Sequence, residues 1–172
     1  MKLLHAKLAG PKTVRLERLL PGPIERVWSY IADGEKRATW FAGGPVEPRA
    51  GGTLDWTFDH GALSHEKETP EKHKGSIGYR FQGKVTRWEP PHAFAYTWGD
   101  GVVTFELETR GQNVMFTITH ERVAEKDQAD VAAAWDTHTG VLDDVLSGAR
   151  PRGFWSTHER LDEAYREALK KT

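Results

Sequence analysis

The sequence predicts an α+β domain in which a curved antiparallel sheet of six to seven strands wraps around a long helix near the C-terminus. Two patterns support this prediction. Apolar and polar side chains alternate with a period of two over most of residues 51–120. The pattern changes to that of an amphipathic helix over residues 129–146. Strands and helices are therefore segregated along the chain, which is typical of the α+β class.

The N-terminal part predicts one strand followed by two short helices. Residues 13–20 alternate as in a half-buried strand, and Pro21-Gly22-Pro23 ends it. The apolar side chains of residues 24–31 then repeat with helical spacing, and Pro23 suits the first turn of that helix. A second short helix is expected over residues 35–40.

The middle of the chain predicts a series of antiparallel strands joined mostly by short turns. Gly83 is a candidate β-bulge, and Asp100-Gly101 is a strong hairpin signal. Residues 60–75 form an unusually long polar connection, which we expect to be either mobile or functional. Its charged part, residues 66–74, favours a solvated hairpin tip. The expected strands lie at 54–58, 77–81, 84–88, 94–98, 103–107 and 114–118.

Two helices are expected at the C-terminal end. The apolar stripe of the first contains Trp135 and His138, whereas Asp136 and Asp143 lie off the stripe and are expected to be solvated. Gly148 and Pro151 end this helix. A last helix is expected over about residues 157–169. The predicted organisation is one domain at 12–148 and a helical extension at 149–172.

Composition narrows the possible functions. The chain has 172 residues and no cysteine, so disulfides, a thiolate nucleophile and a cysteine-based zinc site are excluded. A formal charge of −1 does not provide the basic surface typical of nucleic-acid binding. No apolar run approaches the ~20 residues that a membrane-spanning helix needs. Residues 1–10 lack the pattern of a signal peptide, so a cytoplasmic location is expected. No motif indicates a cofactor or a serine nucleophile.

An ordered set of short segments carries a family resemblance. In this order they resemble the START-like superfamily, also called SRPBCC or birch-pollen-allergen-like. Within it, the chain is similar to bacterial homologues of the C-terminal domain of the heat-shock chaperone ATPase activator. The resemblance covers roughly residues 12–148, whereas the segment after Pro151 and the 60–75 connection depart from it. The matching segments are 14–18, 23–28, Ala38-Thr39-Trp40-Phe41, 51–54, 83–86, 89–98, 103–107, 116–120 and Trp135.

The resemblance implies a helix-grip fold with a hydrophobic cavity between the sheet and the long helix. Relatives include lipid carriers, polyketide cyclases and hydrolytic enzymes, so the fold implies no single chemistry. We therefore expect a carrier or sensor for a small apolar molecule, and binding is favoured over catalysis. The alternative is that the aromatic rings fill the cavity themselves. The candidate ligand-binding residues are Trp40, Phe41, Trp56, Phe58, Tyr79, Tyr96, Trp98, Trp135 and His138.

Three further hypotheses remain open. His138 could act as an acid or base in a cyclase or hydrolase, with a second polar group from Tyr79, Tyr96 or Asp55. A stress- or chaperone-related interaction protein would instead expose an apolar patch, expected on the terminal helix at Phe154, Trp155 and Tyr165. The same helix could form a homodimer. Histidines and acids also gather near the long connection, but their spacing fits no known ligand pattern and no metal site is predicted: His60, His65, His73, Asp59, Glu66 and Glu68.

Overall fold

The computed structural model describes residues 4–170 as an eight-stranded antiparallel sheet with the order β1-β2-β8-β7-β6-β5-β4-β3. Lys2 of the N-terminal segment and the last two residues of the predicted extension lie outside the described residues. The strands are β1 (Ala6–Leu8), β2 (Val14–Pro21), β3 (Ala42–Gly43), β4 (Thr53–Phe58), β5 (Arg80–Glu89), β6 (Ala93–Trp98), β7 (Gly101–Arg110) and β8 (Asn113–His120). The α-helices are α1 (Ile24–Ala32), α2 (Gly34–Arg37), α3 (Gln128–Leu146) and α4 (Phe154–Leu169).

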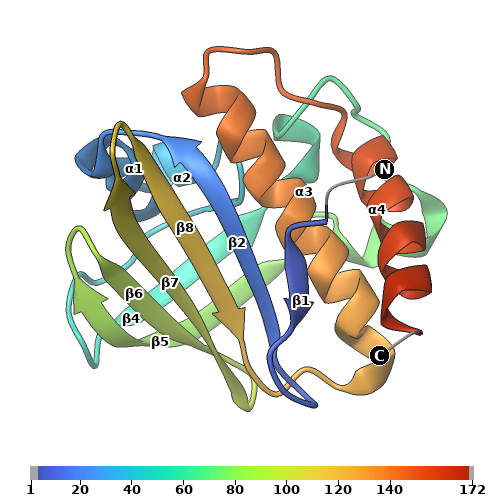
Figure 1. The fold of residues 1–172 in the computed structure, drawn as a ribbon, viewed down its shortest axis with the longest axis horizontal. Coiled ribbons are helices and arrows are strands. Elements are labelled where there is room, and N and C mark those ends of the chain that lie inside the picture. Colours follow the sequence, from blue (N-terminus) through green and yellow to red (C-terminus); the bar gives the residue numbers. More distant parts are fainter. Residues whose placement is uncertain (1–3, 171–172) are drawn as a thin grey trace.

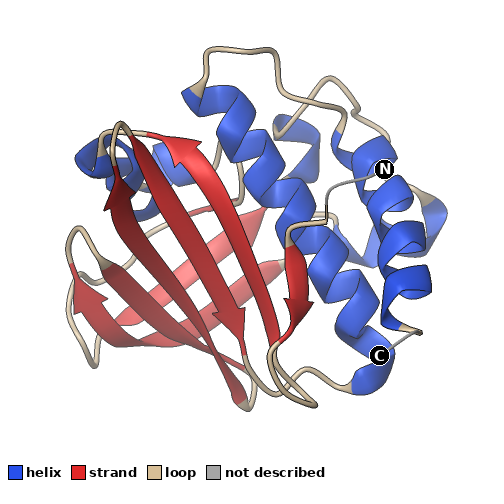
Figure 2. Ribbon diagram, viewed as in Figure 1, coloured by secondary structure: helices blue, strands red, loops and turns tan. Residues whose placement is uncertain are grey.

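The sheet curves around α3, and α4 packs beside α3 (Figure 1). Figure 2 shows the separation of strands and helices that the sequence predicts. Strand β8 pairs with β2 on one side and β7 on the other, so that His120 lies opposite both Val14 and Val103. Because β2 and β8 bury alternate side chains, one face of the sheet is apolar and must be covered. The long helix α3 covers it, and the predicted helix-grip fold is confirmed.

The strand count differs from the prediction at three places. The first and third strands are too short for a period-two pattern to reveal. The two strands expected at 77–81 and 84–88 form one continuous strand, β5, and Ile77 and Tyr79 before it are exposed. The expected bulge at Gly83 is also wrong, because the register shifts between Val85 and Arg87. At Gly83, a Cβ would lie only 2.8 Å from the carbonyl oxygen of Thr97, so close strand packing explains the glycine.

The second helix ends at Arg37, earlier than expected, because the side chain of this residue folds the following segment back. The guanidinium of Arg37 is fully buried and donates to the carbonyl oxygens of Ile31 and Ala42, both at 2.8 Å, and to that of Gly44. It also lies 4.3 Å above the ring of Trp56. The chain therefore turns at once toward β3 and β4.

The charged run at 66–74 is largely exposed, as expected, but the 60–75 connection is not free of the domain, because part of it binds the beginning of α4. The hydroxyl of Ser64 accepts the backbone N–H of Phe154 at 3.0 Å, and the carboxylate of Glu66 accepts that of Ser156 at 2.9 Å. The first N–H groups of a helix lack partners within the helix. The side chains of Ser64 and Glu66 supply two of these missing partners and attach the connection to α4.

The expectation that Asp136 is solvated is wrong. Its carboxylate is buried and accepts from Arg18 on β2 at 2.7 Å and from the hydroxyl of Tyr165 on α4 at 2.6 Å. The Nδ1 atom of His5 lies 3.1 Å from the same carboxylate. Burial alone would raise the pKa of Asp136, but the hydrogen bonds from His5 and Tyr165 and the charge of Arg18 together lower it. A helical pattern locates the apolar stripe, but it does not reveal that a second helix covers the polar side.

The exposed apolar patch expected on the terminal helix is not present. Phe154, Trp155 and Tyr165 are all buried against the domain. Tyr165 also donates to Asp136 of α3 and accepts the backbone N–H of Ala6 at 2.8 Å. The residues that suggested a dimer contact are therefore part of the core of the same chain. None of the described helices is long and apolar enough to cross a membrane.

Candidate functional site

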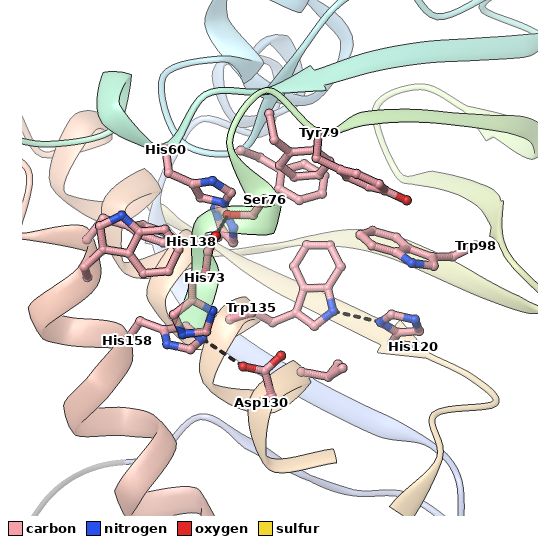
Figure 3. Close-up of a pocket in the computed structure, with 16 residues that line it drawn as sticks. His60, His73, Ser76, Tyr79, Trp98, His120, Asp130, Trp135, His138 and His158 are labelled. Atoms are coloured by element: carbon pink, nitrogen blue, oxygen red, sulfur yellow. Dashed lines mark hydrogen bonds and ion pairs between the residues drawn. The ribbon is translucent and has the colours of Figure 1, made fainter. Parts of the chain in front are cut away.

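A cavity of about 250 Å³ lies between the concave face of the sheet, α3, the first turns of α4 and the connection from β4 to β5. Figure 3 shows its aromatic and histidine side chains pointing toward one another from these elements. Its wall is mostly aromatic, with several imidazoles. The lining residues are Phe41, Phe58, His60, His73, Ser76, Tyr79, Trp98, His120, Asp130, Val131, Ala134, Trp135, His138, Phe154, Trp155 and His158.

Six of the nine predicted ligand-binding residues line this cavity, namely Phe41, Phe58, Tyr79, Trp98, Trp135 and His138. The other three, Trp40, Trp56 and Tyr96, are fully buried elsewhere in the core. Alternation along a strand identifies the side chains that face inward. It does not distinguish a ring that lines a cavity from a ring that is packed against other side chains. The ring of Trp56 lies under Arg37 and 5.0 Å from that of Tyr96, so this part of the interior is solid.

Several lining residues were missed by the sequence reasoning. His120 continues the alternation of Phe116 and Ile118 along β8, so the pattern itself could have identified it. His158 and Trp155 come from α4, for which the family resemblance supplies no role. His60 and His73 belong to the predicted histidine cluster of the long connection, whereas His65 is exposed and does not line the cavity.

His120 is a neutral imidazole that offers an N–H group. Its Nδ1 atom accepts the indole N–H of Trp135 at 3.1 Å. Because an indole nitrogen can only donate, Nδ1 carries the lone pair and the proton is on Nε2. Burial lowers the pKa of His120 to about 4, so this neutral form is dominant near pH 7.

His138 has the opposite tautomer. Its Nδ1 atom lies 2.7 Å from the carbonyl oxygen of Trp40, which can only accept, so Nδ1 carries the proton and Nε2 the lone pair. Burial, followed by the neighbouring His60, lowers the pKa of His138 to about 3. A general acid or base works best with a pKa near the working pH, so this shift does not favour His138 in that role.

His60 adds a third imidazole to the wall. Its ring centroid lies 5.8 Å from that of His138 and 5.0 Å from those of Phe154 and Trp155. Burial, followed by the charge of His158, lowers the pKa of His60 to about 4. His60, His120 and His138 are therefore uncharged near pH 7.

At the edge of the cavity, His73, Asp130 and His158 lie close together. Each offers one ligand atom, and these atoms lie within 4.8 Å of one another. The Nε2 atom of His158 is 3.3 Å from Oδ1 of Asp130 (Figure 3). A hydrogen bond from His158 lowers the pKa of Asp130 and keeps it ionised.

Comparisons with known proteins agree with this fold. A solution NMR structure of a Bordetella parapertussis protein is 35% identical in sequence, with a TM-score of 0.79, and the match covers 94% of this chain and 88% of that one. The crystal structure of CalU16 from Micromonospora echinospora is 18% identical, with a TM-score of 0.66 and coverage of 90% and 86%. A conserved protein of unknown function from Enterococcus faecalis is 16% identical, with a TM-score of 0.69 and coverage of 96% and 90%.

A search of curated proteins finds no match. The family model described as "Activator of Hsp90 ATPase homolog 1-like protein" matches residues 21–147, which is most of the chain. The two structures below 25% identity support the fold alone. The family match and the Bordetella relative also identify the family of the chain. The chain belongs to the Activator of Hsp90 ATPase homolog 1-like family, within the START-like superfamily that the sequence resembles.

Proposed function

We propose that this protein binds a small, mostly apolar molecule in the cavity between the sheet and α3, as a carrier or sensor. The observation that carries the proposal is the wall itself, in which aromatic rings from β4, β6 and α3 surround a space of about 250 Å³. Ligand sites are typically concave and apolar, with a few polar groups that orient the ligand. The rings of Phe58, Trp98 and Trp135 have this role in the proposal.

Two polar groups narrow the class of ligand. His120 offers an N–H donor from Nε2, and His138 offers an acceptor at Nε2. Because both residues line the cavity, a ligand with an apolar ring and a hydroxyl or carbonyl group would satisfy them. The volume lies just below the ~300–1,000 Å³ usual for ligand pockets, which favours a compact ring compound over a sterol or a long acyl chain.

The test combines detection of a ligand with filling of the cavity. Native mass spectrometry of freshly purified protein looks for a co-purified molecule. Titration with phenols, aromatic polyketides, fatty acids and sterols then follows tryptophan fluorescence, because Trp98 and Trp135 lie in the wall. We expect compact phenols or ketones to quench this fluorescence at saturable concentrations. Absence of any co-purified molecule together with absence of saturable quenching across the panel would overturn the proposal.

A matched pair of variants locates the binding. Ala134→Phe puts a ring into the cavity, because Ala134 lines it on α3. Ala168→Phe makes the same change on α4 outside the cavity lining. Circular dichroism checks that both variants are folded. We expect Ala134→Phe to lose most of the ligand-induced quenching and Ala168→Phe to keep it. Equal quenching in both variants would mean that the ligand binds elsewhere.

A further inference from the structure

Three elements that are far apart in the sequence bring metal-binding side chains together at the edge of the cavity. His73 comes from the β4–β5 connection, Asp130 from the first turn of α3, and His158 from α4. One ligand atom from each lies within 4.8 Å of the others. The sequence does not predict this site, because only His73 of the three belongs to the histidine cluster it shows.

The spacing is close to that of a metal site. Ligand distances of ~2.0–2.1 Å around a tetrahedral zinc ion place the ligand atoms about 3.3 Å apart. The His158 Nε2 and Asp130 Oδ1 atoms are already 3.3 Å apart. The ring centroids of His73 and His158 are 5.0 Å apart, with an angle of 83° between the rings. All three ligand atoms lie within 4.8 Å of one another, so a change of about 1.5 Å or less in any pair would give the zinc spacing.

The hydrogen bonding of this cluster is incomplete. The Nε2 atom of His73 and the Nδ1 atom of His158 are buried, and neither has a hydrogen-bond partner among the described residues. Buried polar side-chain atoms usually have a partner, and each exception needs an explanation. An ion pair between His158 and Asp130 alone leaves His73 Nε2 unexplained. A metal ion would give this nitrogen a partner.

The surroundings support the ring of His73 and bring a second carboxylate near it. Its ring stacks on the ring of Trp155, with centroids 4.8 Å apart and an angle of 18°. Such contacts beyond the ligands orient them and contribute to affinity. Asp162 lies one helical turn after His158, and its Oδ1 atom is also buried without a hydrogen-bond partner among the described residues. Its Oδ2 atom accepts from Arg166 at 2.9 Å, so the charge of this second acid is already balanced.

We propose that His73, Asp130 and His158 bind one zinc-type divalent transition-metal ion in the wall of the cavity. Imidazole and carboxylate together suit zinc, cobalt and nickel better than calcium or magnesium, which prefer oxygen ligands alone. Zinc sites with three protein ligands keep a fourth position for water or another molecule. Because all three residues line the cavity, that fourth position is accessible to its contents. The proposal does not rest on the binding of an apolar ligand.

The test uses the full chain after treatment with a chelator, without any organic ligand. Zinc is titrated by calorimetry, and cobalt by visible absorption, because tetrahedral cobalt absorbs much more strongly than octahedral cobalt. We expect one ion per chain, a tetrahedral or five-coordinate cobalt spectrum and a zinc-dependent rise in Tm. No saturable binding, or only the weak spectrum of hydrated cobalt, would overturn the proposal.

Variants identify the ligands. His73→Asn and Asp130→Asn are expected to weaken zinc binding by at least about tenfold, since even residues outside the ligand set can cost ~10–100-fold. His65→Asn is the matched control, because His65 is an exposed histidine of the same connection. A loss in His65→Asn equal to that in His73→Asn would show adventitious surface binding and refute the site. His73 lies outside the α-helices and strands. His73→Asn is therefore expected to fold even if Asp130→Asn does not.

Discussion

Trp135 donates its indole N–H to Nδ1 of His120 at 3.1 Å, and this bond determines which nitrogen of the histidine carries the proton. The bond joins α3 to β8 across the cavity wall (Figure 3). It leaves the Nε2 hydrogen of His120 as a donor, whereas the bond from His138 to Trp40 leaves an acceptor. These two hydrogen bonds, one with the indole of Trp135 and one with the backbone carbonyl of Trp40, thus determine which cavity nitrogen donates and which accepts.

Replacing Trp135 by Phe is expected to destabilise the fold by more than the loss of ring area. Phe keeps an aromatic ring but leaves Nδ1 of His120 buried without its donor, which costs ~1–3 kcal/mol. Urea unfolding measures this difference. Trp28→Phe is the control, because Trp28 is only partly buried and packs edge-on against Trp88. If both variants lose the same free energy of unfolding, the bond to His120 contributes nothing specific.

Stability is expected to fall as the pH is lowered from about 7 to about 4. The pKa of His120 is about 4 and that of His138 about 3 in the folded protein, against 6.5 as the ordinary value. Between these values the unfolded chain binds protons that the folded chain does not, so acid favours unfolding. Over this range, each histidine lowers the free energy of unfolding by up to about 1.4 kcal/mol for each unit by which the pH falls.

The pH dependence is measured by urea unfolding at a series of pH values. The double variant His120→Asn and His138→Asn is expected to reduce the slope, because the asparagine amides do not titrate and can still make the bonds to Trp135 and Trp40. Part of the slope remains, because the pKa of His60 is also about 4. His65→Asn, which changes an exposed residue outside the cavity, is the control. A double variant that keeps the wild-type slope would show that other groups cause the acid sensitivity.

The sequence predicted the fold better than the site, and the residues explain why. Alternation along β8 and the stripe of α3 are local patterns, so they identify which side chains face inward. Whether an inward ring borders a cavity depends on what lies across the interior. Trp56 is covered by Arg37, whereas Trp98 meets open space. The grouping of His73 with His158 depends on the packing of α4, which no local pattern reveals.

Arg37 is expected to be essential for the turn between α1 and β4. It supplies hydrogen bonds to three backbone carbonyls and is fully buried over Trp56. Arg37→Met keeps much of the apolar contact but leaves the carbonyls of Ile31, Ala42 and Gly44 without these donors. Each unsatisfied carbonyl costs ~1–3 kcal/mol, and about three are affected, so the free energy of unfolding is expected to fall by more than about 3 kcal/mol.

Thermal and urea unfolding of Arg37→Met are compared with those of Lys36→Met. Lys36 lies next to Arg37 on the same short helix and is exposed, so it controls for the loss of a positive charge. We expect Lys36→Met to change the free energy of unfolding by no more than about 0.5 kcal/mol. Similar stabilities for the two variants would mean that water replaces the guanidinium at these carbonyls.

Asp136 is expected to be the most sensitive acidic residue of the chain. Its carboxylate lies between Arg18 of β2 and Tyr165 of α4, and both contacts are buried. Asp136→Asn removes the negative charge and leaves the guanidinium of Arg18 with only the partly exposed carboxylate of Asp143, 3.8 Å away. Breaking one side of a buried ion pair costs ~3–5 kcal/mol. Glu159→Gln makes the same chemical change at an exposed position of α4 and is the control.

A second variant separates the charge from the packing. Arg18→Met combined with Asp136→Leu removes both charges and keeps apolar bulk at each position. Because replacing a buried ion pair by apolar groups is often neutral or stabilising, we expect this double variant to unfold at a higher urea concentration than Asp136→Asn alone. A double variant less stable than Asp136→Asn would instead show that the hydrogen bonds to His5 and Tyr165, and not the balance of charge, hold β1 and α4 against α3.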